Sequence, residues 1–134
     1  MEGKYLMKPK TTERTEPFVS SRFSSDYIRK AHEATFANES AIVHSERCTC
    51  FYCGHSFDPS QEEKLHWIEE KPPRERTLRC PMCAIDCVIG SASSFPIEDP
   101  EFILACSEAW FGGISRISDG KPVEKLRYVD LILD

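Results

Sequence analysis

Two cysteine pairs, Cys50-x2-Cys53 and Cys80-x2-Cys83, constrain this chain more than any other feature of its sequence. A two-residue spacer lets the chain fold back so that both sulfurs of a pair reach one ion. Four thiolates in two such pairs match the ligand set of a tetrahedral Zn²⁺ site, although residues 54–79 make an unusually long spacer. Because four protein ligands leave no open position for water, the sequence predicts a structural zinc ion rather than a catalytic one.

Three neighbouring groups are alternative ligands. Cys48 lies just before the first pair, His55 just after it, and Cys87 follows the second pair. Any one of them could replace an assigned ligand, but the spacing of the x2 pairs fits a metal site best. Otherwise, Cys48 and Cys87 are expected to be buried thiols beside the cluster.

Length and cysteine usage indicate one reduced domain. The chain has 134 residues and seven cysteines, an odd number, and residues 1–10 contain no apolar segment typical of a secretory signal. We therefore expect a cytoplasmic, metal-binding protein rather than a disulfide scaffold. The sequence has no apolar run of about 18 residues, so no membrane span is expected. A net charge of −5 counts against nucleic-acid binding, which normally needs a basic surface.

The domain organisation follows from composition and helix signals. Residues 1–24 are polar and are expected to form a flexible or extended arm, and residues 25–134 a single zinc-ribbon-containing domain. The predicted fold class is α+β, a small zinc ribbon of short antiparallel strands flanked by three to four helices. Cap, proline and periodicity signals place the helices at residues 26–36, 38–43, 58–71 and 99–111. Short strands are expected at 77–79 and 88–89, and residues 126–133 are ambiguous between helix and strand.

Side chains near the cysteine pairs form a possible partner contact. Phe51 and Tyr52 lie between the first two ligands, and Arg74, Arg76 and Arg79 precede the second pair. If exposed, the two aromatic rings could stack on bases or fill a pocket of a partner. Alternatively, the rings pack against the helix expected between the pairs, and the arginines form a solvated face.

Residues 31–111 carry a specific combination of motifs. These are Ala31-His32, Asn38, Ile42, Ser45, Cys48-Thr49-Cys50-Phe51-Tyr52-Cys53, Trp67, Cys80-Pro81-Met82-Cys83-Ala84-Ile85-Asp86, Val88-Ile89-Gly90, Ser94, Pro96-Ile97 and Trp110-Phe111. On these residues the chain resembles a family of small bacterial proteins described only as cytoplasmic proteins, with a CxCFYC…CPxCxID zinc-ribbon-like core. The resemblance implies a zinc-binding core and no established activity. The chain departs from the family pattern at Ala84, where the family has glycine, and at Cys87, where it has a small polar residue.

The leading functional hypothesis is a non-enzymatic zinc-binding protein that acts through protein–protein interaction. One form of it is an immunity-type inhibitor of a toxin, because small acidic proteins can present carboxylates to a basic nuclease cleft. The carboxylates available include those of Glu62, Glu63, Glu69 and Glu70.

Two other classes of function are alternatives. The first is nucleic-acid binding through the ribbon, with the two aromatic rings and the arginines as the contact surface. The second is a thiol or zinc enzyme. Its candidate thiols are Cys87 and Cys106 and its candidate bases are His44, His55 and His66. No Gly-rich elbow or phosphate loop supports this second class.

Overall fold

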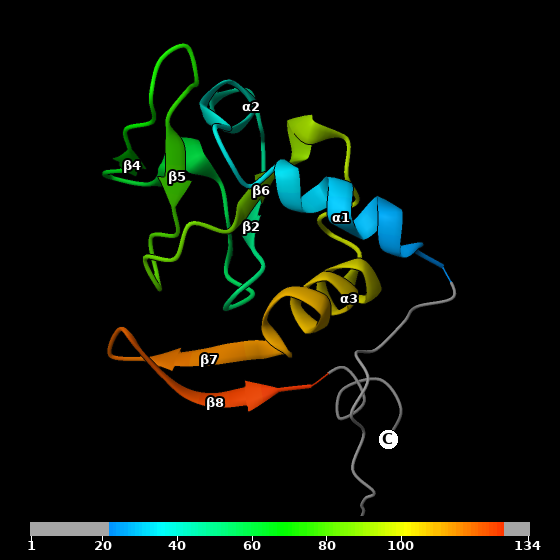
Figure 1. Cartoon of the computed structure of the whole chain (residues 1–134). Coiled ribbons are helices and arrows are strands. Elements are labelled where there is room, and N and C mark those ends of the chain that lie inside the picture. Colours follow the sequence, from blue (N-terminus) through cyan, green and yellow to red (C-terminus); the bar gives the residue numbers. More distant parts are fainter. Residues whose placement is uncertain (1–21, 128–134) are drawn as a thin grey trace, which may run out of the picture.

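The computed structural model of the chain describes residues 22–127. It has three α-helices, α1 (Ser25–Glu33), α2 (Glu39–Val43) and α3 (Pro100–Phe111). The strands of the described part are β2 (Cys48–Cys50), β3 (Ser56–Phe57), β4 (His66–Ile68), β5 (Thr77–Arg79), β6 (Val88–Gly90), β7 (Ile114–Ser118) and β8 (Lys121–Leu126), with 3₁₀ turns at Pro59–Gln61 and Ser91–Ser93. The predicted α+β class, with small antiparallel sheets and a ribbon-like core, is confirmed (Figure 1).

The strands form three small antiparallel sheets. β2 lies between β3 and β6, with Cys48 opposite Phe57 on one side and opposite Gly90 on the other. β4 pairs with β5, and β7 pairs with β8. The strands predicted at 77–79 and 88–89 are thus β5 and β6. Strands of two to six residues have little stability of their own, so their packing must hold them in place.

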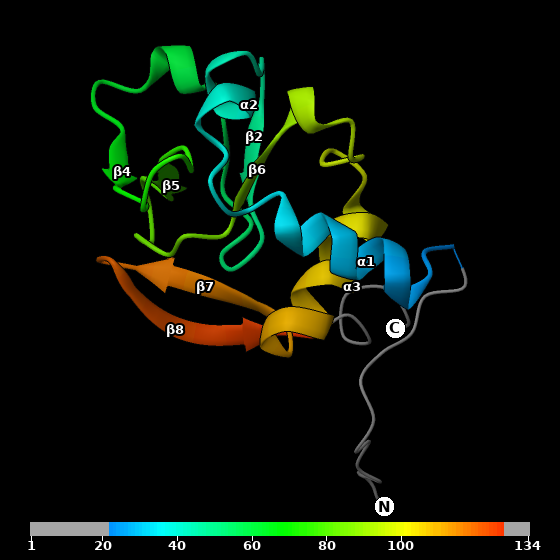
Figure 2. The same cartoon turned by 45° about the horizontal axis from the view of Figure 1, so that its top comes forward.

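The main hydrophobic core lies between α1 and α3, which pack side by side (Figures 1 and 2). The ring of Phe102 on α3 is at its centre, 5.1 Å between centroids from Phe23 and 5.8 Å from Tyr27. Phe23 is 8% exposed, so the folded domain includes residues just before the predicted boundary at 25. Residues 1–21 of the predicted arm lie outside the described residues.

Local signals account for the ends of α1 and α3. The side chain of Ser24 accepts a hydrogen bond from the backbone N–H of Tyr27 and caps α1. Asp99 caps α3 by accepting from the N–H of Glu101, and Pro100 occupies the first helical position. Gly112, in the left-handed conformation with φ of 76°, ends α3 as predicted. No helix in residues 22–127 is long and apolar enough to cross a membrane.

The helix predicted from Asp58 to the prolines at 72–73 is wrong. Asp58 does cap a turn, accepting from the N–H of Ser60, but that 3₁₀ turn ends at Gln61. Residues 66–68 form β4, in which Trp67 pairs with Leu78 of β5. A cap contributes only about 1 kcal/mol, so pairing with a distant strand overrides the local helix signal.

Asn38 occupies the cap position of α2, but its side chain makes no cap bond. Its Nδ2 instead donates to the carbonyl of Val88 at 2.8 Å and to that of Ala34 at 3.3 Å. Its Oδ1 accepts from the N–H of Leu78 at 3.2 Å. One buried amide therefore joins the α1–α2 link to β5 and β6, which carry the backbone on either side of the second cysteine pair.

The hairpin of β7 and β8 was not among the predicted elements. Its two-residue turn is Asp119-Gly120, and both residues have positive φ (54° and 74°), as a type I′ turn requires. The Asp-Gly pair is a hairpin signal that the sequence contained. The hairpin lies below β2 in Figure 1, and Ser115 N–H donates to the carbonyl of Tyr52 in the turn after β2 at 2.8 Å. Of the segment 126–133, whose type was ambiguous, only residues 126 and 127 are described, and β8 ends at 126.

Candidate metal centre

The fold brings the four cysteines of the two pairs together. Their four sulfur atoms all lie within 4.8 Å of one another, and the Cys50–Cys83 and Cys53–Cys80 Sγ distances are both 3.7 Å. Four sulfurs bound tetrahedrally at 2.3 Å from a zinc ion would be about 3.8 Å apart. The four thiols therefore have the spacing that a metal ion needs.

The first pair lies in a tight turn, residues 50–55, that we call the first knuckle. The N–H of Gly54 donates to the carbonyl of Cys50 at 2.8 Å, and the N–H of Cys50 donates to the carbonyl of His55 at 2.8 Å. The N–H of Tyr52 points at the Cys50 sulfur, 3.4 Å away. Such N–H groups stabilise thiolate charge on the sulfur.

The second pair lies in an equivalent turn, residues 80–85, the second knuckle. The N–H of Ala84 donates to the carbonyl of Cys80 at 2.9 Å, and the N–H of Cys80 donates to the carbonyl of Ile85 at 2.9 Å. The N–H of Met82 lies 3.3 Å from the Cys80 sulfur. Each bond of the first knuckle therefore has its counterpart in the second.

The fifth residue of each knuckle has a left-handed backbone. Gly54 has φ of 80° and Ala84 has φ of 70°. Glycine adopts this conformation freely, whereas a Cβ makes it unfavourable. Ala84 therefore keeps the turn despite the departure from the family pattern, at a local conformational cost.

Hydrogen bonding among the four sulfurs shifts the pKa values of the thiols. Hydrogen bonds from Cys50 and then Cys53 hold the pKa of the Cys80 thiol below its ordinary value. Hydrogen bonding to Cys53, then to the other two sulfurs, and burial raise the pKa of Cys50. A divalent ion needs all four as thiolates, so its binding would displace the shared protons.

The three alternative ligands lie outside this group. Within residues 22–127, no His, Cys, Asp or Glu side chain other than the four cysteines belongs to a metal-sized cluster. Cys48 and Cys87 are buried thiols, and burial raises the pKa of each to about 12. The ring of His55 stacks on Phe57, with centroids 5.3 Å apart.

The predicted aromatic contact surface is wrong at Phe51. Its side chain is fully buried and packs against Phe102 and Trp110, with ring centroids 5.8 and 5.5 Å away. These partners lie on α3, not on a helix between the knuckles. Tyr52 is partly buried, edge-on to Phe111 at 5.0 Å.

The three predicted arginines each contact a different partner within the chain. Arg76 makes a two-pronged ion pair with Glu39, at 2.6 and 3.1 Å. The guanidinium of Arg74 lies over the ring of Phe36, 5.5 Å from its centroid, and Arg79 donates to the carbonyl of Ala84 at 3.1 Å. Each arginine thus has its own partner within the chain.

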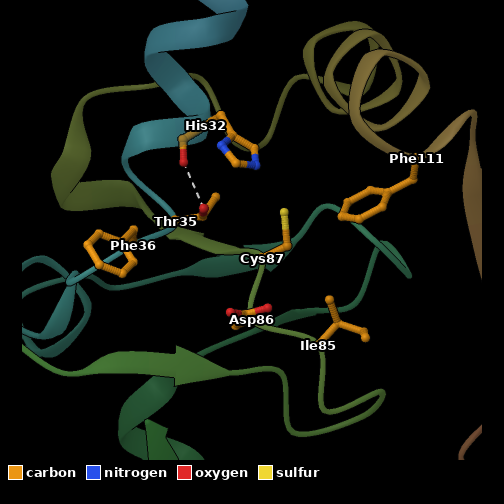
Figure 3. A pocket seen from close by; sticks show the side chains of 7 residues that line it. All are labelled: His32, Thr35, Phe36, Ile85, Asp86, Cys87 and Phe111. Carbon is orange, nitrogen blue, oxygen red and sulfur yellow. Dashed lines mark hydrogen bonds between the residues drawn. The ribbon is translucent and has the colours of Figure 1, made fainter. Parts of the chain in front are cut away.

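A cavity of about 230 Å³ opens beside the second knuckle. Its lining is formed by His32, Thr35, Phe36, Ile85, Asp86, Cys87 and Phe111 (Figure 3). The histidine that shares this cavity with Cys87 is His32, not one of the three considered from the sequence. His32 and Asp86 both fall within the motifs of the resemblance, which is the signal that could have singled them out.

No protein-family model matches the sequence, and neither the curated proteins nor the solved structures contain a significant match.

Proposed function

We propose that this chain is a non-enzymatic zinc-binding protein that acts through protein–protein interaction. The observation that carries the metal part is the set of four sulfurs at ligand spacing between two matched knuckles. Thiolate-only ligation favours zinc among the common divalent ions. Because all four ligands come from the protein, the ion would have no open position at which to activate water.

The role of the ion is to tie together two knuckles that are otherwise joined by the pairing of short strands. The first knuckle extends from β2, and the second knuckle lies between β5 and β6. Each of these strands is three residues long. β2 and β6 pair in one sheet, whereas β5 belongs to another. A zinc ion bound by both knuckles would supply folding free energy that such short strands lack.

The remaining cysteines support a binding protein over a thiol enzyme. Cys48, Cys87 and Cys106 are buried, and burial raises the pKa of each thiol to about 12. A catalytic cysteine needs the opposite shift, since the thiolate is the nucleophile. We assign the protein to the cytoplasm, where the thiols that bind the ion stay reduced.

A protein partner fits the surface better than a nucleic acid does. The net charge is −5, Phe51 is buried, and Arg76 is neutralised by Glu39. Charge complementarity points to a basic partner. An immunity-type inhibitor of a basic toxin is the narrow form of this proposal.

Metal analysis with matched cysteine variants tests the first part. The full-length chain, purified under reducing conditions, should contain one zinc per chain by elemental analysis. Cys80→Ser should lose the ion and unfold. Cys106→Ser is the control, because Cys106 is equally buried but outside the sulfur cluster, and it should keep the ion. Metal retained by Cys80→Ser, or lost equally by both variants, would contradict the assigned ligands.

An affinity purification from the native cell lysate, with and without nuclease, tests the second part. A stoichiometric protein that survives nuclease treatment is the expected result. Enrichment that disappears with nuclease would contradict the proposal and favour nucleic-acid binding. Hydrolytic or redox turnover that requires Cys87 or the bound metal would contradict the non-enzymatic part.

A further inference from the structure

The cavity beside the second knuckle is built by three separate segments. The end of α1 and the residues after it contribute His32, Thr35 and Phe36, the chain after the second knuckle contributes residues 85–87, and the end of α3 contributes Phe111. Figure 3 shows His32 and Asp86 on opposite sides, with Thr35 and Cys87 between them. Elements distant in the sequence thus create a depression that is half apolar and half polar.

Three polar side chains of the cavity have no hydrogen-bond partner among the described residues. One is the ring of His32, which packs edge-on against Trp110 with centroids 4.9 Å apart. The carboxylate of Asp86 is exposed and makes no hydrogen bond or ion pair. The thiol of Cys87 is 3% exposed and also makes none. In contrast, the hydroxyl of Thr35 is used internally, since it donates to the carbonyl of His32 at 2.7 Å.

The charge of the cavity lining favours a cation. Asp86 is the one carboxylate of the lining, and it lies close enough to Cys87 to add to the effect of burial on the pKa of that thiol. Phe36 and Phe111 offer aromatic rings, whose faces attract cations.

The size of the cavity favours a single side chain. Pockets for drug-sized ligands usually measure about 300–1,000 Å³, and this one is about 230 Å³. Phe36, which is 46% exposed, stands at its edge as an apolar surface against which an aliphatic stem can pack. A basic side chain combines an apolar stem with a cationic end, as this lining requires.

We propose that the cavity receives an arginine or lysine side chain of a basic protein partner, with its stem against Phe36 and Ile85 and its charge at Asp86. This inference rests on the proposed protein-binding function and adds the chemistry of the contact. A metal is a poorer occupant, because the His, Cys and Asp of the lining do not converge to ligand spacing. An anion is a poorer occupant because Asp86 would repel it.

Capped amino acids test the chemistry of the cavity without the partner. The full-length, zinc-loaded chain labelled with ¹⁵N is titrated with N-acetyl-arginine amide and N-acetyl-lysine amide, and amide shifts are recorded. N-acetyl-citrulline amide is the control, since citrulline has the shape of arginine without its charge. The basic probes should shift the amides of Thr35, Asp86 and Cys87, and citrulline should shift them much less. Equal shifts with citrulline, or no shifts at these residues, would overturn the proposal.

A matched pair of variants tests the role of the carboxylate. Asp86→Asn should weaken binding of the arginine probe about fivefold, the upper range for an exposed ion pair. The control is Glu33→Gln, which removes an exposed carboxylate of α1 that does not line the cavity, and it should leave binding unchanged. Both variants should keep the wild-type melting temperature, because neither side chain makes a hydrogen bond in the described structure. An unchanged affinity in Asp86→Asn would overturn the proposal.

Repeating the lysate purification with the same two variants separates this inference from the proposed function. If the wild-type chain and Glu33→Gln capture a protein partner, and Asp86→Asn captures several-fold less of it at bait concentrations below saturation, both proposals are supported. Equal capture by all three would overturn the cavity as the contact and leave the protein-binding function in place. If the wild-type chain captures no protein while the basic probe binds, the proposed function fails, and with it the claim that a partner's side chain is the occupant.

Discussion

Exchanging glycine and alanine at the fifth position of the two knuckles should change stability in opposite directions. Ala84→Gly puts glycine, which adopts the left-handed conformation freely, where the backbone has φ of 70°. Gly54→Ala puts alanine, for which this conformation is unfavourable, where φ is 80°. Because the hydrogen bonds of the two turns correspond one to one, each substitution serves as the control for the other.

The expected magnitude follows from the backbone geometry. An L-residue in the left-handed region costs about 1–2 kcal/mol. Replacing it with glycine removes this cost but loses about 0.4–1 kcal/mol, because glycine gives the unfolded chain more conformational freedom. We therefore expect Ala84→Gly to stabilise the protein by about 1 kcal/mol and Gly54→Ala to destabilise it by about as much. A Cβ at Gly54 would lie 3.5 Å from Cγ2 of Ile114, an ordinary contact, so no clash adds to this value.

Equilibrium urea unfolding of the zinc-loaded, reduced chain measures both free energies, with melting temperature as a second readout. A change of about 1 kcal/mol corresponds to about 4–8 °C in a domain of up to 100 residues and slightly less in a larger one. Destabilisation by Ala84→Gly, or stabilisation by Gly54→Ala, would refute the assignment of backbone strain to the second knuckle. So would a loss of bound metal in Ala84→Gly.

Three further predictions concern the buried amide of Asn38, the carboxylate of Glu75, which accepts hydrogen bonds from Ser40, and the metal. Asn38→Ala should lower the free energy of unfolding in urea by about 3 kcal/mol, because it leaves the buried carbonyl of Val88 and N–H of Leu78 without their partner; a loss below about 1 kcal/mol would contradict this. The N–H and then the hydroxyl of Ser40 hold the pKa of Glu75 below its ordinary value, so its stabilisation is present above about pH 4.5 and is lost as the pH falls through the lower, folded pKa. Glu75→Gln should therefore lower the melting temperature at pH 7 by an amount that shrinks at acid pH, and a difference from wild type that is constant with pH would contradict this. Chelation of the metal should abolish the far-ultraviolet circular dichroism of the folded chain, and zinc should restore it; a chelated chain that stays folded would show that the ion is not structural.

The local sequence determined the features that depend on neighbouring residues. The two x2 pairs identified the four sulfurs that gather, because a knuckle positions both its sulfurs through bonds within six residues. The start of α3 followed from Asp99-Pro100 and its end from Gly112, since capping is a local interaction. The strands predicted at 77–79 and 88–89 are also present, because these residues lead directly into and out of the second knuckle.

Only the tertiary structure decided which local signals prevail and which distant side chains meet. Asp58 gives the same helix-start signal as Asp99, yet pairing between β4 and β5 turns the segment into a strand after one turn. Phe51 faces inward because α3 covers the first knuckle, a contact between residues that are far apart in the chain. His32 and Asp86 line one cavity for the same reason. Residue spacing along the chain specifies bonds within a turn, whereas burial and cavities depend on how separate elements pack, and no local pattern contains that information.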